Sequence, residues 1–175
     1  MWKVIGSILL LTGAAGVLQT WITAQRYSQT QVEIFKVFLQ KSLYVMQSEK
    51  IKVVDYFERY IVQLEQKDDA LIHILEEMVK RLSLNTYPSG LMIWEDVFKE
   101  NEKSWNFDSE IFQIIVQAGN GFFGRTREEN IGNLEKYIKE LEKQQERIKQ
   151  KNAQERKVWI PVGMLGTLML VILFL

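Results

Sequence analysis

The chain contains no cysteine, one histidine and two prolines in 175 residues. The absence of cysteine excludes disulfide bonds and zinc sites with thiolate ligands. His73 is the only imidazole, so a histidine-based metal site would need oxygen ligands or residues from another chain.

The chain also lacks an excess of charge of either sign, with 22 Lys and Arg residues against 22 Asp and Glu residues. The two signs are closely mixed in the middle of the chain, and neither forms a block. Proteins that bind nucleic acid present a basic patch or stripe, so this pattern disfavours nucleic acid as a partner.

Charge is absent altogether from two apolar stretches, residues 4–25 and 158–175. As helices they would be roughly 33 Å and 27 Å long, close to the thickness of about 30 Å of a bilayer core. We therefore predict transmembrane helices at residues 1–26 and 158–175, on either side of a middle domain of residues 27–157. A cleaved signal peptide is the alternative for the first stretch, but Ile22 stands where the peptidase prefers a small residue.

Basic residues flank both predicted spans on the side of the middle domain. Three cations follow the first span and five precede the second: Arg26, Lys36 and Lys41, then Arg147, Lys149, Lys151, Arg156 and Lys157. The positive-inside rule therefore predicts a two-span protein of the cell membrane with a cytosolic middle domain. A site for anionic lipid at the second flank is the alternative explanation of these cations.

Apolar residues recur every three or four positions in the first half of the middle domain, which predicts helices. Three are expected, at residues 31–47, at residues 51–66, and from a cap at Asp68 through Leu82. On the second of them the expected buried face consists of Val54, Phe57, Ile61 and Leu64.

Residues 85–90 hold Pro88 and a glycine, and we expect a turn there. A short helix should follow at residues 91–99, and another should begin at a cap provided by Asn106 or Asp108. The interior of that helix is expected to hold Ile111, Ile114 and Ile115. No strand or repeat is indicated, so the expected fold class is all-α, an antiparallel helical bundle.

Three glycines lie between residues 119 and 127, ahead of a long final helix. A glycine-rich loop before a helix can cradle a phosphate, but the Walker motif requires Lys followed by Ser or Thr, and here Arg125 precedes Thr126. An interhelical turn is therefore favoured, with Thr126 and Glu129 as a capping box. The heptad seam of the helix loses its apolar character at Asn152 and Glu155, so we expect a packed start and a solvated end.

No group of residues has the pattern of a catalytic or metal-binding site. The carboxylate pairs at residues 68–69, 76–77 and 128–129 are adjacent in sequence and would point to different sides of a helix. His73 precedes the nearest Glu, which reverses the Glu-x-x-His order of di-iron bundles. Aromatic residues expected to anchor the core or an interface are Trp94, Trp105 and Phe107. We expect no enzyme activity, metal or cofactor.

Small residues recur at four-residue spacing in both predicted spans. Gly16 and Thr20 lie in the first, and Gly163 and Thr167 lie at matching depths in the second. Such positions allow helices to approach closely in a membrane, so the two spans are expected to pack against each other there.

Four segments carry a resemblance to a known family. The chain opens with Lys3-Val4-Ile5-Gly6, and Trp94 precedes an acidic residue after a glycine-containing turn. Gly124-Arg125-Thr126 opens the last helix, and Val162-Gly163-Met164-Leu165 begins the final apolar run. In this order they resemble the stage III sporulation protein AB family, with Gly6, Trp94, Gly124, Thr126 and Gly163 as its motif positions.

The chain departs from the family pattern in places. Arg127 stands where the family usually has Asp, and the family's Gln near Asn130 or Ile131 is missing. Ser48-Glu49-Lys50-Ile51 replaces a Thr-Pro-Leu turn.

The resemblance implies a cytosolic domain similar to the F domain of type II secretion platforms. It also implies a structural part in the stage III sporulation channel between mother cell and forespore, in the mother-cell membrane. Its implied partners are other channel proteins, including a cytosolic ATPase. Two alternatives are a two-span receptor or regulator, and a membrane-bound metal-dependent enzyme that uses His73. Homo-oligomerisation is left open.

Overall fold

The computed structural model describes residues 29–64, 70–84, 89–105 and 107–174. The chain divides into two compact units, one of which is Thr30–Gln144. The described part of the other consists of Gln29 and the C-terminal portion of the last helix, from Gln145 onward. All regular elements in the described residues are helical, so the all-α prediction is confirmed.

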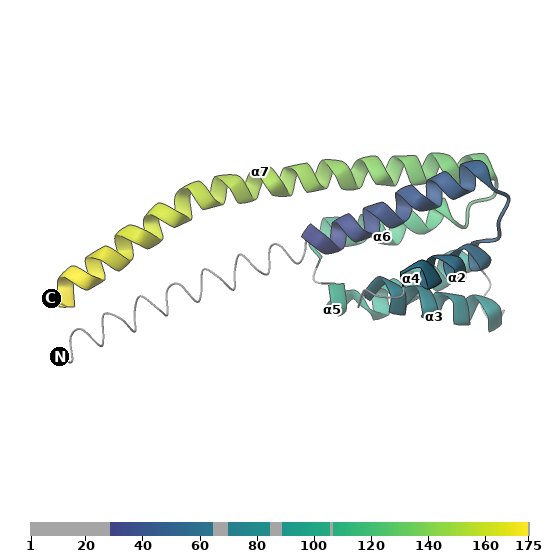
Figure 1. The fold of residues 1–175 in the computed structure, drawn as a ribbon, viewed down its shortest axis with the longest axis horizontal. Helices are drawn as coiled ribbons and strands as arrows, with labels where there is room; N and C mark the ends of the chain where they lie inside the picture. The colour runs from purple at the N-terminus through teal and green to yellow at the C-terminus, as the bar shows by residue number, and fades with distance from the viewer. Residues whose placement is uncertain (1–28, 65–69, 85–88, 106, 175) are drawn as a thin grey trace. The chain divides into compact units, whose positions relative to one another are not determined.

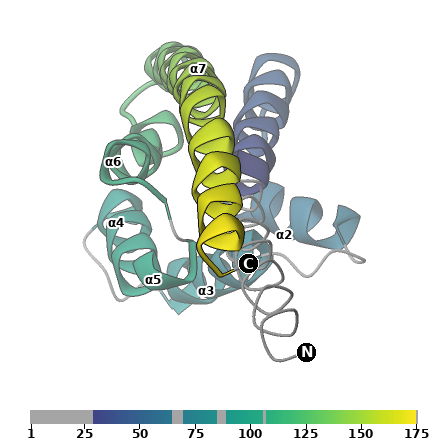
Figure 2. The ribbon, with the colours of Figure 1, turned by 90° about the vertical axis from the view of Figure 1, so that its left-hand side faces the viewer.

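The helices follow the predicted order closely (Figure 1). The first occupies residues 29–48 and is called the 29–48 helix below. It is followed by α2 (Val53–Gln63), α3 (Ala70–Leu84), α4 (Gly90–Glu100), α5 (Glu102–Trp105), α6 (Ser109–Gln117), a 3₁₀ turn η1 (Ala118–Gly121) and α7 (Arg127–Phe174). Seen along the bundle, the helices of the Thr30–Gln144 unit surround a common interior (Figure 2).

The interior of this unit is rich in aromatic rings. Trp94 on α4 is fully buried, and its ring centroid lies 4.7 Å from that of Phe98 and 5.0 Å from that of Phe122. Phe35 and Phe38 bring the 29–48 helix into the same cluster, since Phe35 contacts the rings of α4 and Phe38 those of α2. The indole Nε1 of Trp94 donates a hydrogen bond to the carbonyl oxygen of Ile115, 3.1 Å away. One buried ring system therefore joins four segments that are distant in sequence.

The buried face of α2 differs from the expected one. Phe57 is buried as predicted, but Val54, Ile61 and Leu64 are only half-buried. The other buried side chains are Tyr56 and Tyr60, each 3% exposed. The aromatic interior draws the two tyrosine rings inward because they have more apolar surface to bury than the aliphatic side chains beside them.

The predicted helix starts are confirmed in part. Ser89 precedes α4 and its side chain accepts a hydrogen bond from the amide of Met92 (3.3 Å), so the helix begins at Gly90, one residue before the predicted start. Residues 85–88 of the expected turn lie outside the described residues. Asp108 precedes α6, but its side chain makes no capping hydrogen bond. Asp68, Asn106 and Pro88 lie outside the described residues.

The glycine segment forms a turn, as expected, which begins as the 3₁₀ helix η1. Gly119 packs directly against the indole of Trp94, and a Cβ on Gly119 would lie 2.5 Å from Cδ1 of that ring. A Cβ on Gly121 would lie 2.6 Å from Cδ2 of Leu134 on α7. These glycines allow the backbone to pass close to both side chains.

The start of α7 uses the predicted residues in a shifted arrangement. Thr126 Oγ1 accepts a hydrogen bond from the amide of Glu129 (3.1 Å), as in a capping box. The carboxylate of Glu129 accepts from the amide of Arg125 (3.0 Å), one residue earlier than a capping box requires. Both bonds satisfy backbone donors at the helix entrance.

Within the Thr30–Gln144 unit, α7 buries Leu134, Tyr137, Ile138 and Leu141. The helix then continues through Pro161 to Phe174. Beyond Ile148 the described side chains are exposed or half-buried, as the loss of apolar seam residues predicted. Of the two predicted spans, the first lies outside the described residues, and among the described ones no helix has the length and apolar character needed to cross a membrane.

Candidate functional site

The residues with potential for chemistry do not form a shared site in the described part of the chain. His73 is exposed, and its Nδ1 lies 3.6 Å from a carboxylate oxygen of Glu76 on the same helix turn. No cluster of three or more potential metal ligands occurs among the described residues. The carboxylate of Glu77 is engaged with Arg81 at 2.8 Å.

Arg81 on α3 binds two carboxylates, and the one on α4, Glu100, joins the two helices. Its Nη1 and Nη2 donate to the two carboxylate oxygens of Glu100, at 3.1 Å and 2.6 Å, while its Nε donates to Glu77. These hydrogen bonds hold the pKa values of Glu77 and Glu100 below their ordinary range and raise the pKa of Arg81. A fork-shaped contact of this kind stabilises the charged forms and fixes the relative position of the two helices.

Two amides of the glycine turn donate hydrogen bonds to side chains at the start of α7. The amide of Gly124 donates to the side chain of Asn130 (2.7 Å), and the amide of Arg125 donates to Glu129. A phosphate-binding loop needs such amides to be directed at the ligand. The hydrogen bonds therefore favour the structural interpretation of Gly124 and Thr126, as the entrance of α7.

Arg127, the departure from the family pattern, has a structural role in this chain. Its Nε donates to the carbonyl oxygen of Met46 (2.7 Å), and its Nη2 donates to that of Gln47 (3.0 Å). These carbonyls belong to the last turn of the 29–48 helix, where backbone acceptors lack partners within the helix. Arg127 thereby ties the start of α7 to the end of the 29–48 helix.

The other predicted site residues occupy separate places. Trp94 is at the centre of the core and Phe107 is half-buried, whereas the side chain of Trp105 lies outside the described residues. Gly6, Gly16 and Thr20 also lie outside them. Gly163 is on α7, where a Cβ would meet no atom of the described residues within 4 Å, and Thr167 is on the same helix. The predicted packing of the two spans stays a prediction.

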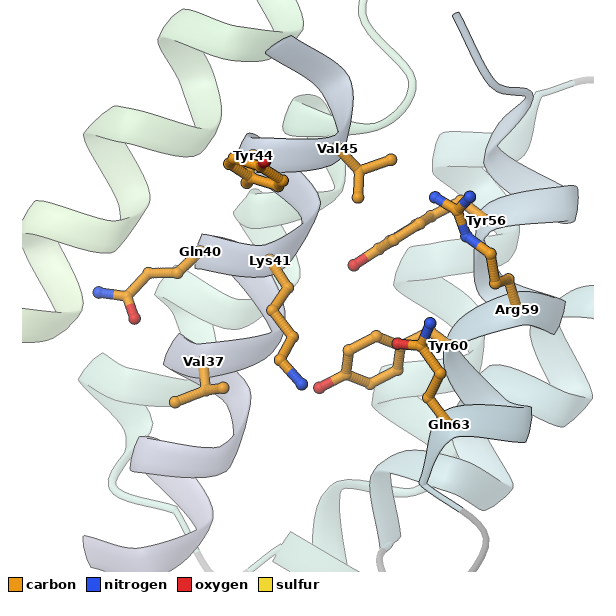
Figure 3. Close-up of a pocket in the computed structure, with 9 residues that line it drawn as sticks. All are labelled: Val37, Gln40, Lys41, Tyr44, Val45, Tyr56, Arg59, Tyr60 and Gln63. Carbon is orange, nitrogen blue, oxygen red and sulfur yellow. The ribbon is translucent and has the colours of Figure 1, made fainter. Parts of the chain in front are cut away.

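A groove that the sequence did not indicate lies between the 29–48 helix and α2 (Figure 3). It encloses about 370 Å³. Its lining consists of Val37, Gln40, Lys41, Tyr44 and Val45 on one side, and Tyr56, Arg59, Tyr60 and Gln63 on the other. We call it the tyrosine groove.

The floor of the tyrosine groove is held by buried polar contacts. Ser42 is fully buried, and its Oγ lies 2.7 Å from the carbonyl oxygen of Phe38 and 3.0 Å from the hydroxyl of Tyr56. Burial raises the pKa of the Tyr56 hydroxyl well above its ordinary value, so this group stays protonated as a hydrogen-bond partner. The tyrosines at positions 56 and 60, four residues apart, were the available sequence signal for this side of the groove.

The rim of the tyrosine groove is exposed and cationic. Tyr44 is 71% exposed, and Lys41 Nζ lies 5.5 Å from the ring centroid of Tyr60. Arg59 Nη1 makes an ion pair of 2.9 Å with Glu49, which is outside the lining. Aromatic faces beside basic groups suit binding of a partner surface better than catalysis.

Comparison with known proteins gives one match. The family model described as stage III sporulation protein AB matches residues 3–175. No curated protein and no solved structure matches at the level that would support a relationship.

Proposed function

The chain belongs to the stage III sporulation protein AB family, and from this premise we propose that it is a non-enzymatic platform component of the sporulation channel. Membership assigns a role in sporulation. The observation that carries the proposal further is the extent of the match, which covers both predicted spans and the whole helical domain between them.

In this proposal the two predicted spans hold the protein in the mother-cell membrane around the forespore, with the helical domain in the cytosol. The basic residues on both flanks of that domain support the orientation, and the lengths of the two apolar runs support the spans. The small residues Gly16, Thr20, Gly163 and Thr167 would let the spans approach each other.

The cytosolic domain is proposed to dock a cytosolic ATPase and other channel proteins. Two features support a docking role over an enzymatic one. The candidate acid–base residues are used in ion pairs or lie singly on the surface, and the tyrosine groove presents aromatic rings beside cations. The alternative of a two-span regulator draws support from α7, a continuous helix from the core toward the predicted second span.

A complementation experiment tests the role. Deletion of the gene should block formation of heat-resistant spores, and the full chain should restore them. A His73→Ala variant should restore them equally, because His73 has no buried or clustered partner on the described surface. Full sporulation without the gene would overturn the platform role. Failure of the His73→Ala variant to restore heat-resistant spores would support the alternative of a metal-dependent enzyme.

Cysteine labelling tests the orientation. Ser48 and Ser109 are both exposed, whereas Ser42 is buried and unsuitable. Cysteines at Ser48 and Ser109 should resist an impermeant thiol reagent in intact cells and react after lysis. Labelling before lysis would place the domain outside the cytosol.

Binding tests the docking role directly. The full chain in lipid nanodiscs should bind the purified cytosolic ATPase, while empty nanodiscs should not. If both kinds of nanodisc retain the ATPase equally, the docking role is wrong.

A further inference from the structure

The tyrosine groove has the geometry of a seat for a helix. Its two walls are helices that each contribute side chains at three- and four-residue spacing, from Val37 to Val45 and from Tyr56 to Gln63. The first stretch is about 12 Å long, or a little over two helical turns. Because the groove lies between two helices and opens to solvent, an added helix could pack against both walls.

The apolar part of the groove is preorganised. The rings of Tyr56 and Tyr60 are packed into the aromatic interior, where each lies within 6.3 Å of the Phe38 ring. The contact between Ser42 and Tyr56 holds the floor from beneath. Groups that are already ordered lose little conformational entropy on binding, so such a floor favours recognition.

The charge of the groove selects the chemistry of its occupant. Lys41 and Arg59 are the ionisable cations of the lining, and the lining contains no carboxylate. The only described carboxylate that pairs with either of them is that of Glu49, on Arg59. Lys41 is exposed, and its side chain reaches toward Tyr60, with Nζ 5.5 Å from the centroid of that ring (Figure 3). An acidic group entering beside Tyr44 would gain a charge pair with Lys41 at low cost.

We propose that the tyrosine groove binds an amphipathic helix of a partner protein whose apolar stripe is flanked by Asp or Glu residues. This inference rests on the proposed docking function and names the surface that performs it. The apolar stripe would cover Tyr44 and Val45 above the buried rings of Tyr56 and Tyr60, and the acidic flank would meet Lys41. Glu49 would keep Arg59 oriented at the rim.

A double variant tests the assignment without damage to the core. Lys41→Glu with Tyr44→Ala reverses the charge at position 41 and removes the exposed ring, and both side chains are exposed. Lys139→Glu with Leu84→Ala is the matched control, because it makes the same charge change and truncates another exposed apolar side chain, 62% exposed. Circular dichroism should show the same helix content and melting temperature for both variants and the wild type.

The purified cytosolic ATPase is the probe, added to the full chain in nanodiscs of neutral lipid. We expect the groove variant to bind about tenfold or more weakly than the wild type, and the control to bind as the wild type does. Binding of the wild type should weaken with rising salt, and the groove variant should show a shallower dependence. The groove variant should also fail to restore heat-resistant spores.

The outcomes separate the inference from the function on which it rests. If the wild type binds the ATPase and the groove variant binds equally well, the groove is not the docking surface, although docking stands. If the wild type does not bind, docking itself fails and the inference falls with it. If the groove variant changes only self-association, or binding only to anionic vesicles, the occupant is a second copy or lipid and the proposal is wrong.

Discussion

The interior of the Thr30–Gln144 unit and the C-terminal stretch of α7 both contain apolar side chains on helices, yet these differ in burial. In the interior, Leu134 and Leu141 of α7 are fully buried beneath other helices. In the stretch from Gln145 onward, Val158, Val162 and Leu165 are more than half exposed within the described structure. Apolar side chains at helical spacing therefore do not by themselves determine burial, because burial requires a partner surface at the right distance.

The difference also appears in how tightly the backbone is surrounded. Gly119 and Gly121 stand where any side chain would collide with Trp94 or Leu134. Gly163 and Gly166 meet no atom of the described residues within 4 Å of a built Cβ. A single added methyl group would therefore clash at these positions in the interior. In the C-terminal stretch, a methyl group at Gly163 or Gly166 would meet no described atom.

The largest expected effect comes from removing the central ring. Trp94→Ala should destabilise the folded domain by about 3–5 kcal/mol, because it empties a large buried site and removes the indole donor from the carbonyl oxygen of Ile115, which the amide of Ala118 also reaches. Thermal melting of the full chain in detergent micelles, followed by circular dichroism, measures the loss. Val162→Ala is the matched change in the C-terminal stretch and should leave the melt of the domain unchanged. Equal shifts in melting temperature for the two variants would contradict the proposed difference between the interior and the C-terminal stretch.

A second pair of variants adds a methyl group rather than removing a ring. Gly119→Ala should cost about 1–3 kcal/mol, since the new Cβ would press against the Trp94 indole. Gly166→Ala should be neutral or slightly stabilising, because it adds helix propensity in open space. The same melting experiment compares them, and a stable Gly119→Ala protein would show that the indole can move aside.

A contact at the edge of the unit should have an intermediate effect. Arg127→Ala removes two hydrogen bonds to the end of the 29–48 helix and should cost about 1 kcal/mol. Amide hydrogen exchange at Gln47 and Ser48 should become faster. Arg125→Ala, an exposed arginine two residues earlier, is the control and should change neither stability nor exchange. Unchanged exchange in the Arg127 variant would mean that the last turn is held by other contacts.

The smallest expected effect is a dependence on pH. Arg81 lowers the pKa values of Glu77 and Glu100 in the folded state, so their contribution to stability is complete above their ordinary pKa of 4.5. It is lost as the pH falls through the lowered folded-state values. Arg81→Gln should therefore lower the melting temperature slightly at pH 7, and its difference from the wild type should shrink in acid. A difference that stays constant down to pH 3 would argue against these ion pairs, and Lys139→Gln should show none at any pH.

Several elements of the fold could be predicted from local sequence. The helical periods of residues 31–47 and 91–99, the burial of Ile111, Ile114 and Ile115, and the helix start at Thr126 all depend on residues close together in the chain. The family resemblance likewise depended on short motifs in order, and the full-length match confirms it.

The tertiary structure decided how those helices share one interior. The inward positions of Tyr56 and Tyr60 follow from their packing against the ring of Phe38, which lies on another helix. The same holds for Arg127, whose acceptors lie 80 and 81 residues earlier, and for the tyrosine groove, which exists only where two helices lie side by side. Local sequence determines helix formation because backbone hydrogen bonds and caps are made within a few residues. Packing against distant segments decides which face is buried and which surface is left for a partner.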